Sequence, residues 1–448
     1  MGLFLLVGYG VGDVVGPGIY GTVGDAAVQM GNAVWLSFVV SMVAAVLTGL
    51  SYACLASRYP RAAGPAHVTH RAFQVGFLSY LIGLMVTASG LTSMATSTNV
   101  FTKTVLGLTM AQPEAAMQGW PWYLVALSFL GVLTLVNFWG IRQSMWANIL
   151  CTLVEVGGLL FIIAIGARYW GGVDYLETPK AASGGLGVGM PLGGSVLTFF
   201  SFIGFEDMLN VSEEVKEPRR TMPLGIVLAQ TVVAILYIGV AVTAVSVVPY
   251  QEFATRELSP LARVAGAAAP WLHPRTFDFV TLFAVSNTVL INYIMGSRLL
   301  YGMARQGLMP AVFGSVHRTR HTPHVAILTL LAVVMVLAIS GGVDAVKQLA
   351  DATALLLLCS FIVVNTSLIV LKLRPGEARG GFEVPIAVPA LGVLVNATMI
   401  VARITSSTAG GRALAIAGAI IGGIVLLYFI VRPKNVTEQS LAAVEEAA

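Results

Sequence analysis

The chain has 448 residues, of which 57% are hydrophobic and only 10% are charged, and its formal net charge is +4. Soluble globular domains carry roughly 25% charged residues, so this composition excludes an ordinary soluble protein and indicates an integral membrane protein. A net charge this small, spread over the loops of such a chain, does not indicate nucleic-acid binding.

Apolar runs divide the chain into about twelve candidate spans of the roughly 20 residues that a bilayer requires. We therefore predict an all-α integral membrane protein. The predicted spans cover residues 2–24, 32–57, 72–102, 121–141, 143–167, 187–211, 222–249, 279–297, 325–343, 352–371, 384–402 and 413–431.

The distribution of Lys and Arg predicts how these spans are oriented. Sixteen of the 25 basic residues fall in loops on the side of the two termini, and nine fall in loops on the opposite side. Loops rich in Lys and Arg stay on the cytoplasmic side. Both termini are therefore predicted to be cytoplasmic, with residues 432–448 as a tail, in a multi-pass protein of the cell membrane.

The first apolar run differs from a plain lipid-facing helix. Between Gly8 and Gly21 it carries six glycines, a proline and Asp13. The sequence Gly16-Pro17-Gly18 removes a backbone donor and the helical preference within three residues. A break of this kind persists in a bilayer only where protein or a watered cavity satisfies the freed backbone groups. We therefore predict either a broken helix that forms a binding site or a kink required by packing.

The sixth span carries a similar interruption, because Gly204 precedes Glu206 and Asp207. Two interrupted spans at corresponding positions are typical of transporters built from inverted repeats. This spacing predicts a first repeat of five spans over residues 1–170 and a second over residues 186–373. The two spans in residues 384–431 are predicted to be additions.

Several stretches carry a resemblance to a known family. They are Gly16–Tyr20, Gly49–Arg61, Phe202–Glu206 together with Glu213–Arg219, and Ser297–Pro310. Together they resemble the amino acid–polyamine–organocation (APC) superfamily, in particular its cationic and neutral amino acid permease branch. The resemblance implies a LeuT-like fold with a 5+5 inverted repeat, and amino acid transport.

The chemistry of the breaks agrees with this implication. An amino acid is a zwitterion, so its binding site needs hydrogen-bond donors for the carboxylate and acceptors for the ammonium group. The half-helix that begins at Gly18 presents N–H groups and a positive dipole end to a carboxylate. The half-helix that ends near Val14 presents carbonyls to an ammonium group, and the resemblance implies that the sixth span completes this site. The predicted substrate-binding residues are Val14, Val15, Gly16, Pro17, Gly18, Ile19, Phe200, Ser201, Ile203 and Phe205.

Two features of this predicted site leave alternatives open. Pro17 stands where relatives often have Ser or Thr, so one donor is missing, although a proline also suits the first turn of a helix. The aromatic side chains Phe200, Phe202 and Phe205 either close over the substrate or pack the helix bundle. The resemblance favours Phe200 as the gating aromatic.

Carboxylates inside predicted spans are expected to have a function, because they are costly in a bilayer. The predicted coupling and gating residues are Asp13, Glu155, Glu206, Ser286 and Thr288. Glu155 occupies a position that commonly carries a lysine in the proton-coupled permeases that this chain resembles. It is expected to carry the coupling proton, to ligate Na⁺ with Asp13 and a hydroxyl of Ser286 or Thr288, or to hold neighbouring helices together. Glu206 is expected to be a structural and gating partner, and Asp207, about 100° further round a helix, is expected to face elsewhere.

We therefore predict a secondary active amino acid transporter, with H⁺ favoured over Na⁺ as the coupling ion. Neither a nucleotide-binding loop nor a hydrolase motif is present, so catalysis, ATP-driven transport and a resident cofactor or metal have no support in the sequence. The alternatives are a transporter of the same fold for polyamines or other organic solutes, an exchanger, and a membrane receptor that binds amino acids without moving them. The expected partners are a small-molecule amino acid and membrane lipid, and the oligomeric state is not predicted.

Overall fold

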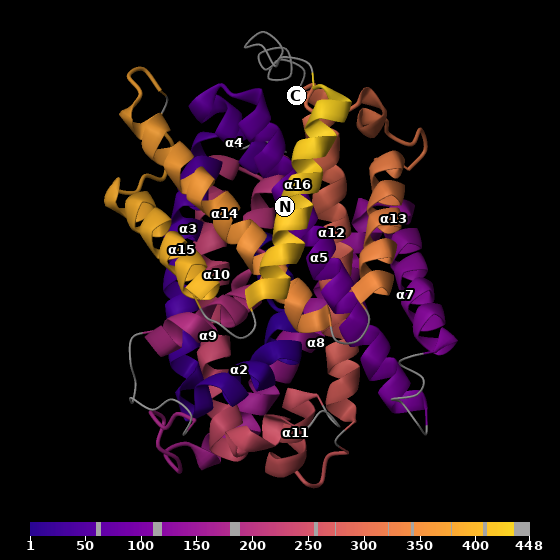
Figure 1. Ribbon diagram of the computed structural model, residues 1–448, viewed down its shortest axis with the longest axis vertical. Coiled ribbons are helices and arrows are strands. Elements are labelled where there is room, and N and C mark those ends of the chain that lie inside the picture. Colours follow the sequence, from indigo (N-terminus) through magenta and orange to yellow (C-terminus); the bar gives the residue numbers. More distant parts are fainter. Residues whose placement is uncertain are drawn as a thin grey trace.

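The computed structural model describes residues 1–59, 64–110, 119–179, 189–254, 259–273, 275–320, 322–341, 345–377, 379–405 and 410–433. Every regular element in these residues is a helix, and most helices run along the long axis of the molecule (Figure 1). Nine of the helices formed by these residues are long and apolar enough to cross a membrane. The prediction of an all-helical membrane fold is confirmed, whereas the count of twelve spans stays a prediction.

The first predicted span is broken where the sequence indicated. Helix α1 (Leu3–Val14) ends before Gly16-Pro17, and a π-helical turn (Gly18–Thr22) leads into α2 (Val23–Met30). The next helix, α3 (Val34–Arg58), follows α2 after a single 3₁₀ turn. This break is the expected effect of Gly-Pro-Gly on a helical backbone.

The sixth predicted span is also interrupted. Helix α9 (Gly189–Phe199) passes into a 3₁₀ turn (Phe200–Phe202), and a second 3₁₀ helix (Phe205–Glu214) follows Gly204. Gly204 has a φ of 129°, a backbone conformation that strongly favours glycine.

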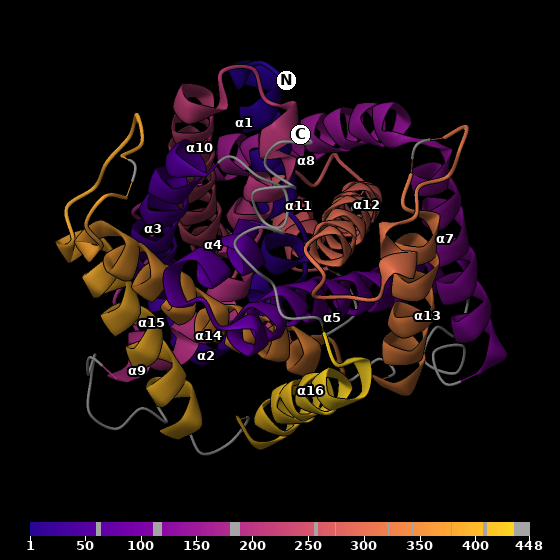
Figure 2. The same cartoon turned by 90° about the horizontal axis from the view of Figure 1, so that it is seen from above.

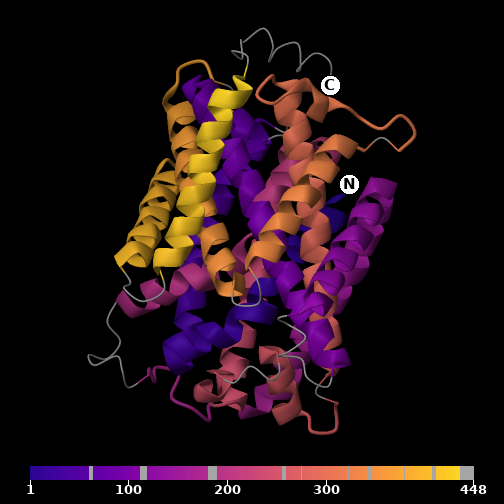
Figure 3. The same cartoon turned by 45° about the vertical axis from the view of Figure 1, so that its right-hand side comes forward.

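The remaining helices complete the bundle and its loops. They are α4 (Gly64–Phe73), α5 (Gly76–Thr109), α7 (Trp120–Trp139), α8 (Ile141–Gly166), α10 (Pro218–Val247), α11 (Pro260–Ala268), α12 (Thr276–Arg305), α13 (His324–Gly341), α14 (Ala345–Leu373), α15 (Ala387–Thr405) and α16 (Gly410–Val431). The short helices α4 and α11 were not predicted, because a search for long apolar runs passes over loop helices. They lie at opposite ends of the molecule (Figures 1 and 3).

The broken segments lie inside the bundle and other helices lie at its edge. Helix α1 packs against α8, α10 and α12, whereas α7, α13, α15 and α16 lie toward the outside when the molecule is seen from above (Figure 2). Residues Tyr9 to Val14 of α1 are all buried, but large apolar side chains such as Leu135 on α7 and Phe429 on α16 are exposed. Exposed apolar surface of this kind suits contact with lipid.

Helix α15 is attached to α3 and α14 by polar contacts at different heights. The Asn396 amide of α15 and the Asn365 amide of α14 both donate to the Thr48 hydroxyl of α3, at 3.0 and 3.2 Å. Further along α15, Arg403 forms a buried ion pair with Asp351 of α14. These contacts join α15 to a helix from each half of the chain.

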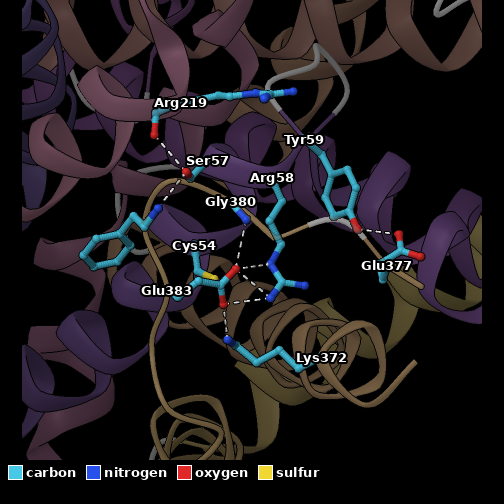
Figure 4. Close-up of polar contacts among 10 residues, drawn as sticks. Cys54, Ser57, Arg58, Tyr59, Arg219, Lys372, Glu377, Gly380 and Glu383 are labelled. Atoms are coloured by element: carbon cyan, nitrogen blue, oxygen red, sulfur yellow. Dashed lines mark hydrogen bonds and ion pairs between the residues drawn. The ribbon is translucent and has the colours of Figure 1, made fainter. Parts of the chain in front are cut away.

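A third attachment lies in the segment just before α15, at Glu383 (Figure 4). The Arg58 guanidinium at the end of α3 donates to both Glu383 oxygens, at 2.8 and 2.7 Å, and Lys372 of α14 also pairs with Glu383. Beside them, the Ser57 hydroxyl donates to the Arg219 carbonyl at 2.8 Å and accepts the Phe382 N–H at 3.0 Å. We call the group of Arg58, Lys372 and Glu383 the Glu383 cluster.

Replacing Glu383 tests how much this cluster stabilises the fold. Burial by itself raises the pKa of the Glu383 carboxyl, but hydrogen bonds from Arg58, Lys372 and the Gly380 N–H outweigh burial and lower this pKa to about 2. We expect Glu383→Gln to lower the free energy of unfolding by about 1–2 kcal/mol, because Arg58 is left nearly buried without an anionic partner.

The pH dependence of this effect has a definite sign. The folded-state pKa lies below the ordinary value of 4.5, so the contribution of Glu383 is present above pH 4.5 and is lost as the pH falls toward 2. The difference in thermal unfolding between wild type and Glu383→Gln in detergent should shrink over this range. The control is Glu217→Gln, which makes the same chemical change at an exposed glutamate. A difference that does not change with pH contradicts the assignment.

Candidate binding site between the two breaks

The two broken segments cross in direct contact. A Cβ atom on Gly18 would lie 2.4 Å from the Cα of Ser201, and one on Gly204 would lie 2.8 Å from the backbone carbonyl of Asp13. Gly16 lies equally close to α12, since its Cβ would be 2.3 Å from the Thr288 hydroxyl. Side chains at Gly18 and Gly204 would push the two broken segments apart, and one at Gly16 would push against α12, so the glycines permit this close packing.

A small pocket with a cavity volume of about 20 Å³ lies at this crossing. Five of the ten predicted substrate-binding residues line it, together with three carboxylates and parts of α5 and α12. The lining consists of Asp13, Val14, Pro17, Gly18, Ser89, Gly90, Ser93, Phe200, Ile203, Gly204, Glu206, Asp207, Thr288, Asn292 and Met295. None of these residues is Lys, Arg or His, so the charged side chains of the lining are all acidic.

The other five predicted residues are buried beside the pocket but do not line it. They are Val15, Gly16, Ile19, Ser201 and Phe205. Phe205 packs edge-on against Tyr52 and also contacts Phe361, which favours its packing interpretation. Phe202 likewise packs against Phe38 and Tyr237. Phe200 alone of the three lines the pocket, and its role as a gate stays a prediction.

Side chains from other helices hold the carbonyls at the end of α1. The Tyr237 hydroxyl of α10 donates to the Val14 carbonyl at 2.7 Å, and the Asn287 amide of α12 donates to the Gly12 carbonyl at 3.1 Å. The carbonyl that the sequence assigned to a substrate ammonium therefore already has one partner. A carbonyl oxygen has two lone pairs, so Val14 can still accept a second hydrogen bond.

Glu206 and Asp207 both border the pocket, which corrects one expectation. Glu206 accepts the Gly204 N–H at 2.9 Å and so holds the second break, as expected of a structural partner. Asp207 was expected to face elsewhere, but it also lines the pocket. Both residues belong to the first turn after Gly204, so the pocket borders the beginning of this helix rather than one side of it. One carboxyl oxygen of Asp13 and one of Asp207 have no hydrogen-bond partner within the described residues.

Glu155 lies in α8 next to this site but does not line the pocket. Its side chain is 0% exposed, and neither of its carboxyl oxygens has a hydrogen-bond partner in the part of the chain that the structure describes. Its backbone carbonyl accepts the Tyr20 hydroxyl at 2.6 Å, which attaches the part of the first span that follows the break to α8. A buried carboxyl without a hydrogen-bond partner is costly to ionise.

The structure brings one of the two predicted hydroxyls to the first break. Thr288 lines the pocket opposite Gly16, whereas Ser286 is half-buried, lies outside the lining and donates to the Leu282 carbonyl of its own helix. Among the described residues, no group of three or more His, Cys, Asp or Glu side chains is arranged so that it could hold a metal ion. The proposed roles of Ser286 and Thr288 in ion binding stay predictions.

Comparison with known proteins identifies the family. The sequence model of the family described as amino acid permease matches residues 1–431. The chain belongs to this family. It is therefore a member of the APC superfamily, whose members matched here are transporters and not enzymes.

Three relatives show the range of the family. The chain is 25% identical to the branched-chain amino acid permease BcaP of Bacillus subtilis, over 88% of this chain and 86% of that protein. It is 30% identical to the vacuolar cationic amino acid transporter 4 of Arabidopsis thaliana, over 83% of this chain but only 63% of that transporter. A methylthioribose transporter of Bacillus subtilis is 27% identical over 84% of this chain and 82% of its own length. The chain thus spans less than two thirds of the plant relative.

Sequence reasoning missed Tyr237 and Asn287, which hold the first break, and Ser89, Ser93 and Asn292, which line the pocket. Asn287 and Asn292 stand in a predicted span, where a buried polar side chain is itself a signal. Nothing in the local sequence around Tyr237 indicates its partner, because that partner is 223 residues away.

Substituting Gly18 tests whether the crossing is required. Gly18→Ala would place its Cβ against the backbone of Ser201, so we expect uptake of radiolabelled leucine or arginine into proteoliposomes to fall about tenfold or more. Gly8→Ala in the same run is the matched control, because a Cβ there would meet nothing within 4 Å. Equal activity of the two variants would contradict the requirement for close contact.

Proposed function

We propose that this chain is a secondary active transporter that carries amino acids across the cell membrane by alternating access. The observation that supports this proposal is the pocket between the two breaks, where helix ends and carboxylates meet inside the bundle. In this proposal the fold is LeuT-like, with repeats over residues 1–170 and 186–373, two added helices in residues 384–431, and cytoplasmic termini. The crossing of the interrupted segments agrees with binding between two inverted repeats.

The pocket offers complementary groups to both charges of an amino acid. The segment that begins at Gly18 directs a helix N-terminus toward a substrate carboxylate. Asp13 and Asp207 have carboxyl oxygens without partners that would accept an ammonium group. Because the lining has acidic but not basic side chains, the proposed substrates have neutral or cationic side chains, since an anionic side chain would find no basic partner there.

Polyamines are a second candidate substrate class. The sequence suggested too few acidic groups for a polyamine, but three carboxylates border the pocket. The methylthioribose transporter among the relatives is consistent with organic solutes other than amino acids in this family. A polyamine has no carboxylate, so it would leave the donors at Gly18 unused, and this favours an amino acid.

Competition with unlabelled solutes separates these substrate classes. We expect leucine or arginine in excess to reduce labelled uptake into proteoliposomes, and glutamate to have at least about tenfold weaker effect, because its side chain would face three carboxylates. Spermidine is the polyamine probe. Inhibition by glutamate equal to that by leucine would contradict the charge argument, and inhibition by spermidine alone would favour the polyamine function. Binding in detergent without uptake would indicate a receptor.

We propose that protons drive the transport and that Glu155 carries them. A buried carboxyl without hydrogen-bond donors is stable when neutral and unstable when ionised, so it is suited to bind and release a proton as water gains and loses access. Sodium coupling through Asp13, Glu155 and Thr288 and substrate exchange without an ion are the alternatives.

Glu155→Gln tests this coupling. The amide mimics the neutral acid, so we expect the variant to retain exchange of internal for external substrate but to lose accumulation driven by an inward pH gradient. Asp278→Asn, at the start of α12 and outside the pocket lining, is the control. Unchanged accumulation in Glu155→Gln would show that Glu155 is not the carrier, and accumulation driven by an Na⁺ gradient would indicate sodium coupling.

A further inference from the structure

A second cavity lies outside the candidate binding site. Its volume is about 650 Å³, which is within the range of sites that hold small molecules. It lies between the end of α5 and the beginning of α12, two helices that pack side by side, at the end of the molecule where α11 lies (Figure 1). Its lining shares no residue with that of the pocket between the two breaks. We call this cavity the α5–α12 groove.

The walls of the α5–α12 groove are apolar. Val105 and Leu108 of α5 form one side, and Phe279 and Leu282 of α12 form the other. The members of each pair are three residues apart, so they lie on one face of their helix. Phe279 is 58% exposed. Exposed apolar walls on the bundle of a membrane protein are suited to contact with an acyl chain.

Polar groups line the groove where the two helices meet their loops. Thr109 ends α5, Thr276 begins α12, and His273 and Arg275 come just before α12. The Arg275 guanidinium lies 3.4 Å from the Leu108 carbonyl, and within the described residues it forms no ion pair. The His273 Nδ1 accepts the Arg275 N–H at 3.3 Å, so its Nε2 is the ring nitrogen that can donate to a ligand. The groove thus changes from apolar to basic along its length.

The charge of the groove favours an anion. None of its lining residues is acidic, whereas three carboxylates line the pocket between the breaks. Asp278 is close to Arg275 in the sequence but does not line the groove; it is 9% exposed and accepts the Ser259 hydroxyl at 3.0 Å. Arg275 can therefore offer its N–H groups to a ligand, and a guanidinium matches the geometry of a phosphate.

We propose that the α5–α12 groove binds an anionic glycerophospholipid, with its phosphate at Arg275 and His273 and an acyl chain between Leu108 and Leu282. Basic pockets between membrane helices are known sites for anionic headgroups. A free anion would leave the apolar walls uncovered, and a neutral lipid would leave the basic groups without a counter-charge. Helices α5 and α12 also line the pocket between the breaks, through residues such as Ser93 and Asn292. The bound lipid would therefore hold together two helices that form the binding site.

Native mass spectrometry of the purified full chain tests this proposal. The chain in detergent is mixed with phosphatidylglycerol or with phosphatidylcholine that has the same acyl chains. We expect wild type to retain phosphatidylglycerol at least about fivefold better, the effect of one basic residue beside an anionic lipid. Arg275→Gln, at an exposed position, should lose this preference. Leu282→Trp keeps both basic residues but fills the groove, so it should retain less of both lipids, and it remains informative if Arg275→Gln does not fold.

Arg412 provides the matched control, because it is an exposed arginine at the start of α16 that lines neither cavity. Arg412→Gln should keep the wild-type preference. Equal retention of the two lipids by wild type, equal loss of preference in the two arginine variants, or unchanged retention in Leu282→Trp would overturn the proposal. Thermal stabilisation of wild type by inorganic phosphate as large as that by phosphatidylglycerol would indicate a site for free anions and would also overturn it.

Discussion

The requirement to satisfy backbone polar groups inside an apolar bundle governs this structure. Breaking two helices in the middle of the molecule frees N–H and carbonyl groups that water cannot reach freely. The structure meets the cost with specific partners: Tyr237 for Val14, Asn287 for Gly12 and Glu206 for Gly204. Residues that flank the two breaks, among them Val14, Gly18 and Gly204, line the pocket. The pocket therefore lies at the same interruptions that would otherwise destabilise the fold.

Local features of the sequence were sufficient to predict the breaks. Gly16-Pro17-Gly18 acts on the backbone wherever it occurs, and the helix ends at Val14 as that chemistry requires. Helix lengths followed from apolar runs, although α5 and α12 extend past their predicted ends to Thr109 and Arg305. The helical turns beyond the apolar run carry polar residues, so a search for apolar runs does not find them.

The long-range partners in the site required the structure. Tyr237, Asn287 and Asn292 are single polar residues in apolar helices, and their positions in the sequence do not reveal which carbonyl or pocket they face. Asp207 was assigned the wrong direction because its position was judged by α-helical rotation, whereas it lies in the first turn of a 3₁₀ helix at the pocket edge. The substrate-binding residues were predicted from their closeness to the breaks along the chain. Half of them line the pocket, because the direction in which each residue faces cannot be inferred from its place in the sequence.

The attachments of α15 bear on which parts of the bundle are free to shift. This helix is joined to α3 through Thr48, to α14 through Asp351, and near Glu383 to both. Two contacts on α15 and one in the segment just before it resist sliding as well as rotation, so α3, α14 and α15 form a unit that includes a helix from each half of the chain. A helix held in this way resists displacement relative to α3 and α14, so lipid against its exposed apolar face would act on the three helices together.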